Sequence, residues 1–105
     1  MQIEVQKARR MKLSAFADQH GLKMKVVERT RTDLHPSFPY GPNRWLAHFD
    51  DVEVKDGSVL IGTHGNGATQ AQAIKNYARE ISGKCLVVNA FNRETRREIY
   101  APELV

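Results

Sequence analysis

The segment Gly62–Gly83, GTHGNGATQAQAIKNYAREISG, places three glycines in front of an amphipathic stretch and decides how the chain is interpreted. Glycines before a helix either let backbone N–H groups close on a phosphate or let a strand turn out of its sheet. The spacing G-x-x-G-x-G differs from the dinucleotide-binding pattern, and no Lys-Ser/Thr pair follows as in a P-loop. We therefore predict a structural turn in which the glycines supply positive φ angles. An anion contact is the alternative, and His64 and Asn66 are the side chains available for it.

The residues after the glycines predict a helix with a defined start and end. Thr69 and Gln72 have the spacing of a capping box, and Gly83 stands where the helix should end. The apolar residues at helical spacing, which we predict to be buried, are Ile74, Tyr77, Ala78 and Ile81.

The N-terminal third of the chain predicts a short helix followed by a strand and a long loop. KLSAFADQHG has apolar residues at helical spacing and ends at Gly21, where a left-handed cap belongs. LKMKVVERTR alternates apolar and charged residues through Leu22, Met24 and Val26, which is typical of a strand with one buried face. Residues 31–43 contain three prolines and a glycine, so we expect a long Pro-rich loop there.

The segment 44–62, RWLAHFDDVEVKDGSVLIG, predicts a hairpin that turns at Asp56-Gly57. Its apolar residues change parity between Phe49 and Val52, which indicates a bulge near Asp50–Asp51. After the second helix, CLVVNA and RREIYAP predict two more strands joined by FNRET. The predicted fold is α+β, with one antiparallel sheet and both helices packed on one of its faces.

The length and composition indicate one small domain, residues 1–105, with a single two-layer core. No apolar run approaches the roughly 20 residues that span a bilayer, and MQIEVQKARRMKL lacks the apolar stretch of a secretory signal. Cys85 is the single cysteine, which excludes an internal disulfide framework. We expect a cytoplasmic protein that makes no membrane contact.

The formal net charge of +4 is unevenly distributed along the chain. Residues 1–31 carry eight Lys and Arg against three acids, whereas residues 32–65 carry two against five. A basic N-terminal arm, residues 1–11, can therefore contact an acidic partner such as nucleic acid. A solvated surface that keeps the protein soluble is the alternative interpretation of the same charges.

The order of elements resembles the double-stranded RNA-binding domain, whose core is αβββα. The likeness rests on Gly41-Pro42, on Gly57 in the hairpin turn and on the Gly-x-Gly segment at residues 65–69, and it covers residues 13 to about 82. It implies an αβββα core to which the last two strands add a C-terminal β-hairpin.

Two departures from that family concern its grip on RNA. The family grips phosphates with a Lys-Lys-x-Ala-Lys run at the start of the second helix. The corresponding residues here, Gln70, Ala71 and Ile74, are uncharged, and the loop that follows Gly41-Pro42 has Arg44 in place of the family's histidine. The resemblance thus implies a shared fold with weaker RNA binding, in which Arg44 contacts a phosphate or a sugar.

Two further resemblances are less specific. The stretch from Trp45 through AIKNYAREISGKCLVVNA to REIYAPEL is similar to small uncharacterised proteins of tailed phages and prophages, which implies a viral origin and no particular reaction. The GATQAQAI segment resembles antitoxins of the HicB type, which implies a partner-binding module.

Catalytic and metal-binding patterns are weak. The four histidines lack zinc-ligand spacing, and Cys85 opens an apolar strand, as a core cysteine does. His48 with Asp50, Asp51 and other nearby acids can bind a hard cation, but a salt-bridged strand face is the interpretation that we favour. A weak ribonuclease that uses His64 or His48 as its base is the less favoured alternative. We expect no cofactor and no bound metal.

We therefore predict a small non-enzymatic binding protein of phage type that holds nucleic acid, duplex or single strand, through phosphate contacts. The alternative is a protein-interaction module for a host or phage protein, which would use the Pro-rich loop or the edge of the added hairpin. The residues predicted to contact nucleic acid are Lys7, Arg9, Arg10, Lys12, Asn43, Arg44, His64 and Asn66.

Overall fold

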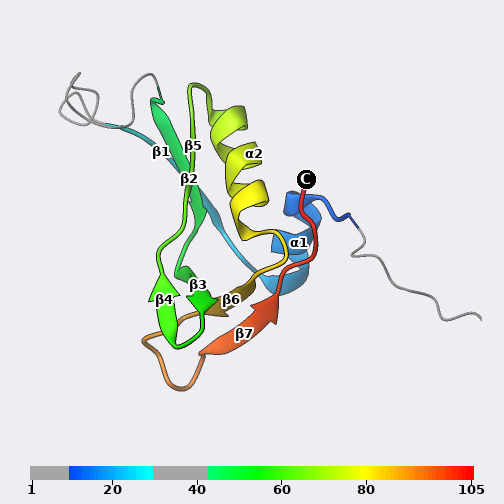
Figure 1. The fold of residues 1–105 in the computed structure, drawn as a ribbon, viewed down its shortest axis with the longest axis vertical. Helices are drawn as coiled ribbons and strands as arrows, with labels where there is room; N and C mark the ends of the chain where they lie inside the picture. The colour runs from blue at the N-terminus through cyan, green and yellow to red at the C-terminus, as the bar shows by residue number, and fades with distance from the viewer. Residues whose placement is uncertain (1–9, 30–42) are drawn as a thin grey trace, which may run out of the picture.

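The computed structural model of the protein describes residues 10–29 and 43–105 (Figure 1). The described elements are α1 (Leu13–His20), β1 (Met24–Glu28), β2 (Trp45–Phe49), β3 (Val52–Asp56), β4 (Val59–Ile61), β5 (Gly65–Gly67), α2 (Gln70–Ile81), β6 (Cys85–Val88) and β7 (Arg97–Tyr100). The α+β class is confirmed. Lys7, Arg9 and nearly all of the predicted Pro-rich loop lie outside the described residues.

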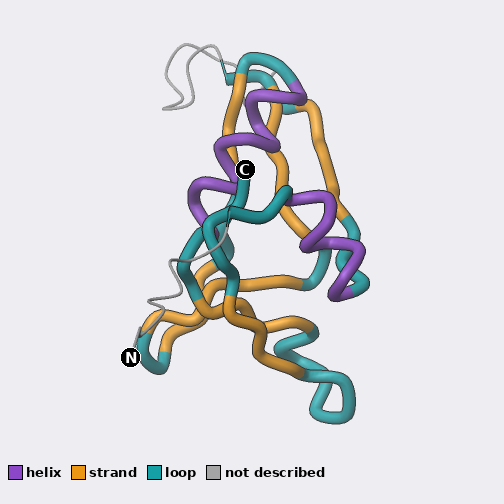
Figure 2. The backbone as a smooth tube through the Cα atoms, turned by 90° about the vertical axis from the view of Figure 1, so that its right-hand side faces the viewer, coloured by secondary structure: helices purple, strands orange, loops and turns teal. Residues whose placement is uncertain are grey.

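The strands form two antiparallel sheets, so the prediction of one sheet is wrong. One sheet has the order β1-β2-β5 and the other has the order β4-β3-β6-β7. Figure 2 shows the two sets of strands running in different directions, one rising beside the longer helix and the other lying across its lower end. In the second sheet β6 pairs with β3 on one side and with β7 on the other.

The two sheets are joined by one long hairpin that bends on both arms. Its turn at Gly57, which has φ 61°, is confirmed. Val54 pairs with Ile61 and Ala47 pairs with Gly65, so residues 48–53 of the first arm stand against only residues 62–64 of the second. The parity change at Asp50–Asp51 does mark an irregularity, but the prediction of a bulge is wrong. The irregularity is a corner at which the strand changes sheets.

Helix α2 begins as predicted at Thr69, whose Oγ1 accepts a hydrogen bond from the Gln72 amide at 3.1 Å. The Gln72 side chain accepts in return from the amide of Ala68 at 3.2 Å, one residue before the expected position. The buried residues of α2 are Ala73, Tyr77, Ala78 and Ile81. Ile74, predicted to be buried, is only partly covered.

Gly65 and Gly67 allow α2 to lie directly on the backbone of β5. A Cβ atom on Gly65 would lie 2.2 Å from the Ala73 carbonyl oxygen, and one on Gly67 would lie 2.4 Å from the Ala73 amide nitrogen. Neither glycine has a positive φ, so the prediction of left-handed turn residues here is wrong. The glycines permit close packing of a strand against a helix.

The core brings both helices onto one face of the three-stranded sheet. The Phe49 ring lies 6.4 Å from the Phe16 ring of α1 and 5.3 Å from the Tyr77 ring of α2, between ring centroids. All three side chains are at most 1% exposed. The predicted cap at Gly21 is confirmed by its φ of 66°.

Neither described helix is both long enough and apolar enough to cross a membrane.

Candidate functional site

The face of the three-stranded sheet opposite Phe49 carries most of the polar side chains that the sheet presents. Lys25 pairs with His48, Val27 pairs with Leu46, and Leu46 pairs in turn with Asn66. Directly opposed residues project from the same face, and so do alternate residues along a strand. These side chains therefore lie together, on the side away from the two helices.

Two more pairs extend this face at its ends. The Arg29 amide donates to the Arg44 carbonyl at 2.7 Å, which continues the β1–β2 ladder by one step. The β2–β5 register, continued by one step, sets His64 opposite His48. We call this surface the open face, and its residues are Lys25, Val27, Arg29, Arg44, Leu46, His48, His64 and Asn66.

Arg29 is held across the sheet. Its Nη2 donates to Oδ1 of Asn66, and since β2 lies between β1 and β5, the guanidinium must lie over β2. Asn66 is fixed from its other side, because Asn76 of α2 donates to its backbone carbonyl at 2.6 Å. Only 8% of Arg29 is exposed. The side chain predicted as an anion contact, Asn66, therefore positions an arginine.

The two histidines of the open face share a surface cavity of about 360 Å³. Partial burial lowers the pKa of His64 below its ordinary value of 6.5, and the charges of Arg29 and His48 lower it further. The His64 imidazole is therefore neutral at pH 7. Nδ1 of His48 lies 2.9 Å from the Phe49 carbonyl oxygen, which can only accept, so Nδ1 carries the hydrogen in this contact.

Acidic side chains also line this cavity. They are Asp50, Asp51 and Glu53. Asp50 pairs with Lys25 at 3.4 Å, and at the far end of the face Arg44 pairs with Glu28 at 3.6 Å. Within residues 10–29 and 43–105, no group of three or more His, Cys, Asp or Glu side chains is placed to hold a metal ion.

The structure brings together three of the eight predicted contact residues. Arg44, His64 and Asn66 lie on the open face, with Asn43 next to Arg44 in the chain. Arg10 and Lys12 lie elsewhere, just before α1, where Arg10 pairs with Glu103 at 3.3 Å. Figure 1 shows α1 beside the C-terminal segment, well away from the start of β2 at the top of the molecule. A single surface made by the arm and Arg44 is not formed by the described residues.

Sequence reasoning missed Lys25 and Arg29 as members of the site. Lys25, Val27 and Arg29 are alternate residues, which point to the same face of a strand, so their spacing was a signal that two cations share one face. The pairing of His48 with His64 had no signal in the sequence, because it depends on a register across the corner.

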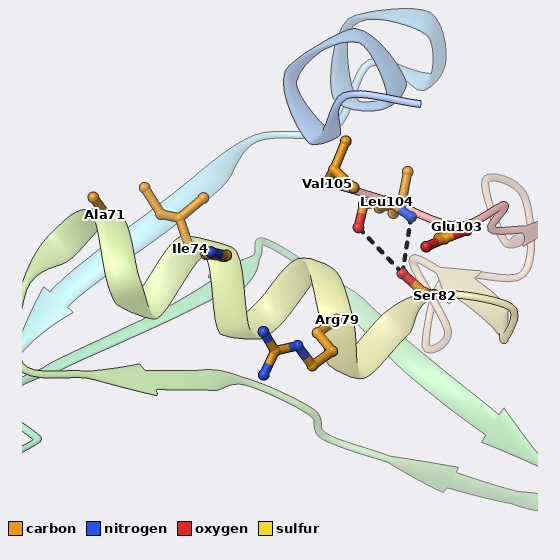
Figure 3. Close-up of a pocket in the computed structure, with 8 residues that line it drawn as sticks. Ala71, Ile74, Arg79, Ser82, Glu103, Leu104 and Val105 are labelled. Atoms are coloured by element: carbon orange, nitrogen blue, oxygen red, sulfur yellow. Dashed lines mark hydrogen bonds between the residues drawn. The ribbon is translucent and has the colours of Figure 1, made fainter. Parts of the chain in front are cut away.

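A second, larger groove of about 700 Å³ lies between α2 and the C-terminal segment (Figure 3). Ala71, Ile74, Leu104 and Val105 give it an apolar lining, which is where the partly exposed Ile74 projects. The Ser82 hydroxyl is engaged there, because it accepts from the Leu104 amide at 2.9 Å. Lys75, Arg79 and Glu103 also line this groove.

No protein-family model, no curated protein and no solved structure matches this chain. The fold and the site define it as a small α+β domain whose three-stranded sheet presents cations and a histidine pair.

Proposed function

We propose that the protein binds single-stranded nucleic acid on the open face. The observation that carries the proposal is the arrangement of cations in two rows across the open face. In one row Lys25 lies beside the histidine pair, and in the other Arg29 lies beside Arg44. Phosphate oxygens accept hydrogen bonds from Arg and Lys, and neutralising them releases counterions, which drives binding.

The dimensions of the open face favour one strand. Neighbouring strands lie about 4.8 Å apart, so the three strands span about 10 Å, which suits a single backbone with its bases. Val27, 45% exposed, and Leu46 form an apolar centre between the cationic rows, against which a base can pack. Arg44 and Lys25, whose side chains are 59% and 57% exposed, make the phosphate contacts, whereas Arg29, held by Asn66 and only 8% exposed, adds its charge to the face.

This proposal places the ligand differently from the double-stranded RNA-binding domain. The start of α2, where that family holds phosphates, carries no cation in Gln70, Ala71 or Ile74. The shared αβββα order and the origin in a tailed phage or prophage stay predictions.

The test is fluorescence anisotropy with labelled single-stranded RNA, single-stranded DNA and duplex RNA at two salt concentrations. We expect the single strands to bind more tightly than the duplex, and Arg44→Ala to weaken binding and flatten the salt slope by about 0.7. Arg93→Ala, in the exposed loop after β6, removes the same charge and is the matched control. Absence of binding at micromolar protein in low salt, or equal effects of both variants, would overturn the proposal.

A protein-interaction module is the second candidate, and exposed apolar side chains near the outer strands of the four-stranded sheet favour it. Phe91 is 92% exposed, and Tyr100 on the outer strand β7 is 73% exposed. If this function holds, a polypeptide captured at high salt is lost from Phe91→Ala and Tyr100→Ser and retained by Arg44→Ala. A protein partner captured equally by all variants would exclude this surface.

A further inference from the structure

We propose that the His48–His64 pair cleaves single-stranded RNA at the open face, transferring the phosphate to the neighbouring 2′ oxygen. This inference rests on the proposed function, because the pair acts on the strand that the open face holds.

The first support is geometric. The β2–β5 pairing ends at Ala47 and Gly65, and the next residues of the two segments, His48 and His64, line one cavity that is open to solvent. Directly opposed Cβ atoms on neighbouring strands are about 5 Å apart, so two side chains one step beyond the end of a ladder are near enough to flank one phosphate. One imidazole then reaches the attacking oxygen while the other reaches the leaving oxygen.

The second support is the state of each ring. His64 is neutral at pH 7 and therefore accepts a proton, whereas Nδ1 of His48 is engaged by the Phe49 carbonyl oxygen, which leaves Nε2 for contact with a substrate. The charge of Arg29, which Asn66 holds across the sheet, acts on the His64 ring. Charge that develops on a phosphate is stabilised by such a fixed cation.

The step is balanced without a co-reactant. His64 removes the proton of the 2′-hydroxyl, and the 2′ oxygen forms a bond to phosphorus. The bond from phosphorus to the 5′ oxygen of the next nucleotide breaks, and that oxygen takes the proton from Nε2 of His48. The products are a 2′,3′-cyclic phosphate and a 5′-hydroxyl, and proton exchange with water restores both rings. DNA lacks the 2′-hydroxyl and is bound without being cut.

The pH dependence of the step is set by every charged group around the pair. Asp50 and Asp51 from the corner and Glu53 from β3 line the shared cavity, Lys25 is paired with His48 across the β1–β2 ladder, and the charge of Arg29 acts on His64. Arg79 and Glu80 from α2 line a different cavity, which includes His64 but not His48. Arg79 also borders the apolar groove, and Figure 3 shows its guanidinium turned away from Leu104 and Val105. With these groups in place, the cleavage rate should rise with pH as His64 loses its proton, and the midpoint of this rise should lie below pH 6.5.

The experiment uses a labelled DNA oligonucleotide that contains one ribonucleotide, with the all-DNA oligonucleotide as its matched control. We expect cleavage only after the ribonucleotide, with a cyclic phosphate identified by mass spectrometry. His64→Gln and His48→Gln should each lower the rate by about 100-fold or more, and Arg93→Ala should leave it unchanged. Both histidines are partly exposed, and circular dichroism checks that the variants fold.

Binding and cleavage separate the two proposals. If the all-DNA strand binds with the expected salt dependence and the ribonucleotide strand stays intact, the cleavage inference is wrong and the proposed function stands. If neither strand binds, both are wrong. Cleavage that persists in both histidine variants, or that also cuts the all-DNA strand, overturns the inference, because then the chemistry does not come from this pair.

Discussion

Gly65→Ala adds one methyl group where β5 touches α2. Its Cβ would lie 2.2 Å from both the Ala73 carbonyl oxygen and the Tyr77 amide nitrogen, and 2.7 Å from the Tyr77 Cα. Favourable heavy-atom contacts begin at about 3.5 Å, so the helix would have to move away by about 1 Å. All three atoms belong to the helix backbone, so no change of side-chain rotamer relieves the clash.

The expected cost follows from this geometry. Overpacking a core costs about 1–3 kcal/mol, and a clash with backbone on every side belongs at the upper end, about 3 kcal/mol. In a domain of this size each kcal/mol lowers the Tm by about 4–8 °C, so the Tm should fall by roughly 12–24 °C.

Gly62→Ala is the matched control. It adds the same methyl group in the same segment, where nothing lies within 4 Å and φ is not positive. We expect its free energy of unfolding to stay within about 1 kcal/mol of the parent, on the stabilising side, because alanine restricts the unfolded chain. Urea unfolding followed by circular dichroism and by the fluorescence of Trp45 measures both variants. A Gly65→Ala protein within about 0.5 kcal/mol of the parent, or a Gly62→Ala protein equally weakened, would refute the close-approach argument.

Three further predictions concern single groups. Thr69→Ala removes the cap of α2 and should lower the free energy of unfolding by about 1 kcal/mol in urea; an unchanged midpoint would contradict the cap. Burial raises the pKa of Tyr77 from 10.0 to about 12, so the folded state keeps its phenolic proton longer than the unfolded state does. Stability should therefore be intact below pH 10 and fall by about 2–3 kcal/mol as the pH rises to about 12, a fall that Tyr77→Phe should lack in alkaline urea titrations. NMR titration should place the pKa of His64 below 6.5, and His48→Gln should raise it; an unchanged value would show that the two rings do not interact.

Local chemistry made much of the fold predictable. Gly21 and Thr69 mark a helix end and a helix start by the hydrogen bonds and φ angles that only a few residue types allow. The alternation through Met24 and Val26 identified the buried side of β1, and both residues pack against the core. These signals need no knowledge of distant residues.

The rest depended on contacts between distant segments. Gly-Asn-Gly has low strand propensity, yet residues 65–67 form β5 because β2 and α2 enclose them. The corner at Asp50–Asp51 divides the sheet because the Val52 side of the strand finds its partner in β6, a segment more than 30 residues away in the chain. The histidine pair forms at that corner, so the proximity of the two rings could not be predicted before the strand register was known.

Gly65 and Gly67, on which α2 packs, are linked to the open face by hydrogen bonds, although α2 and the open face lie on opposite sides of β5. Asn76 reaches the Asn66 carbonyl because Gly65 and Gly67 let α2 lie against the strand. Asn66 in turn accepts from Arg29, the cation that acts on His64. A displaced α2 therefore loosens Arg29 through Asn66, so Gly65→Ala should weaken strand binding even at temperatures where the protein remains folded. Binding that survives a shifted helix would mean that Arg29 is held by the sheet alone.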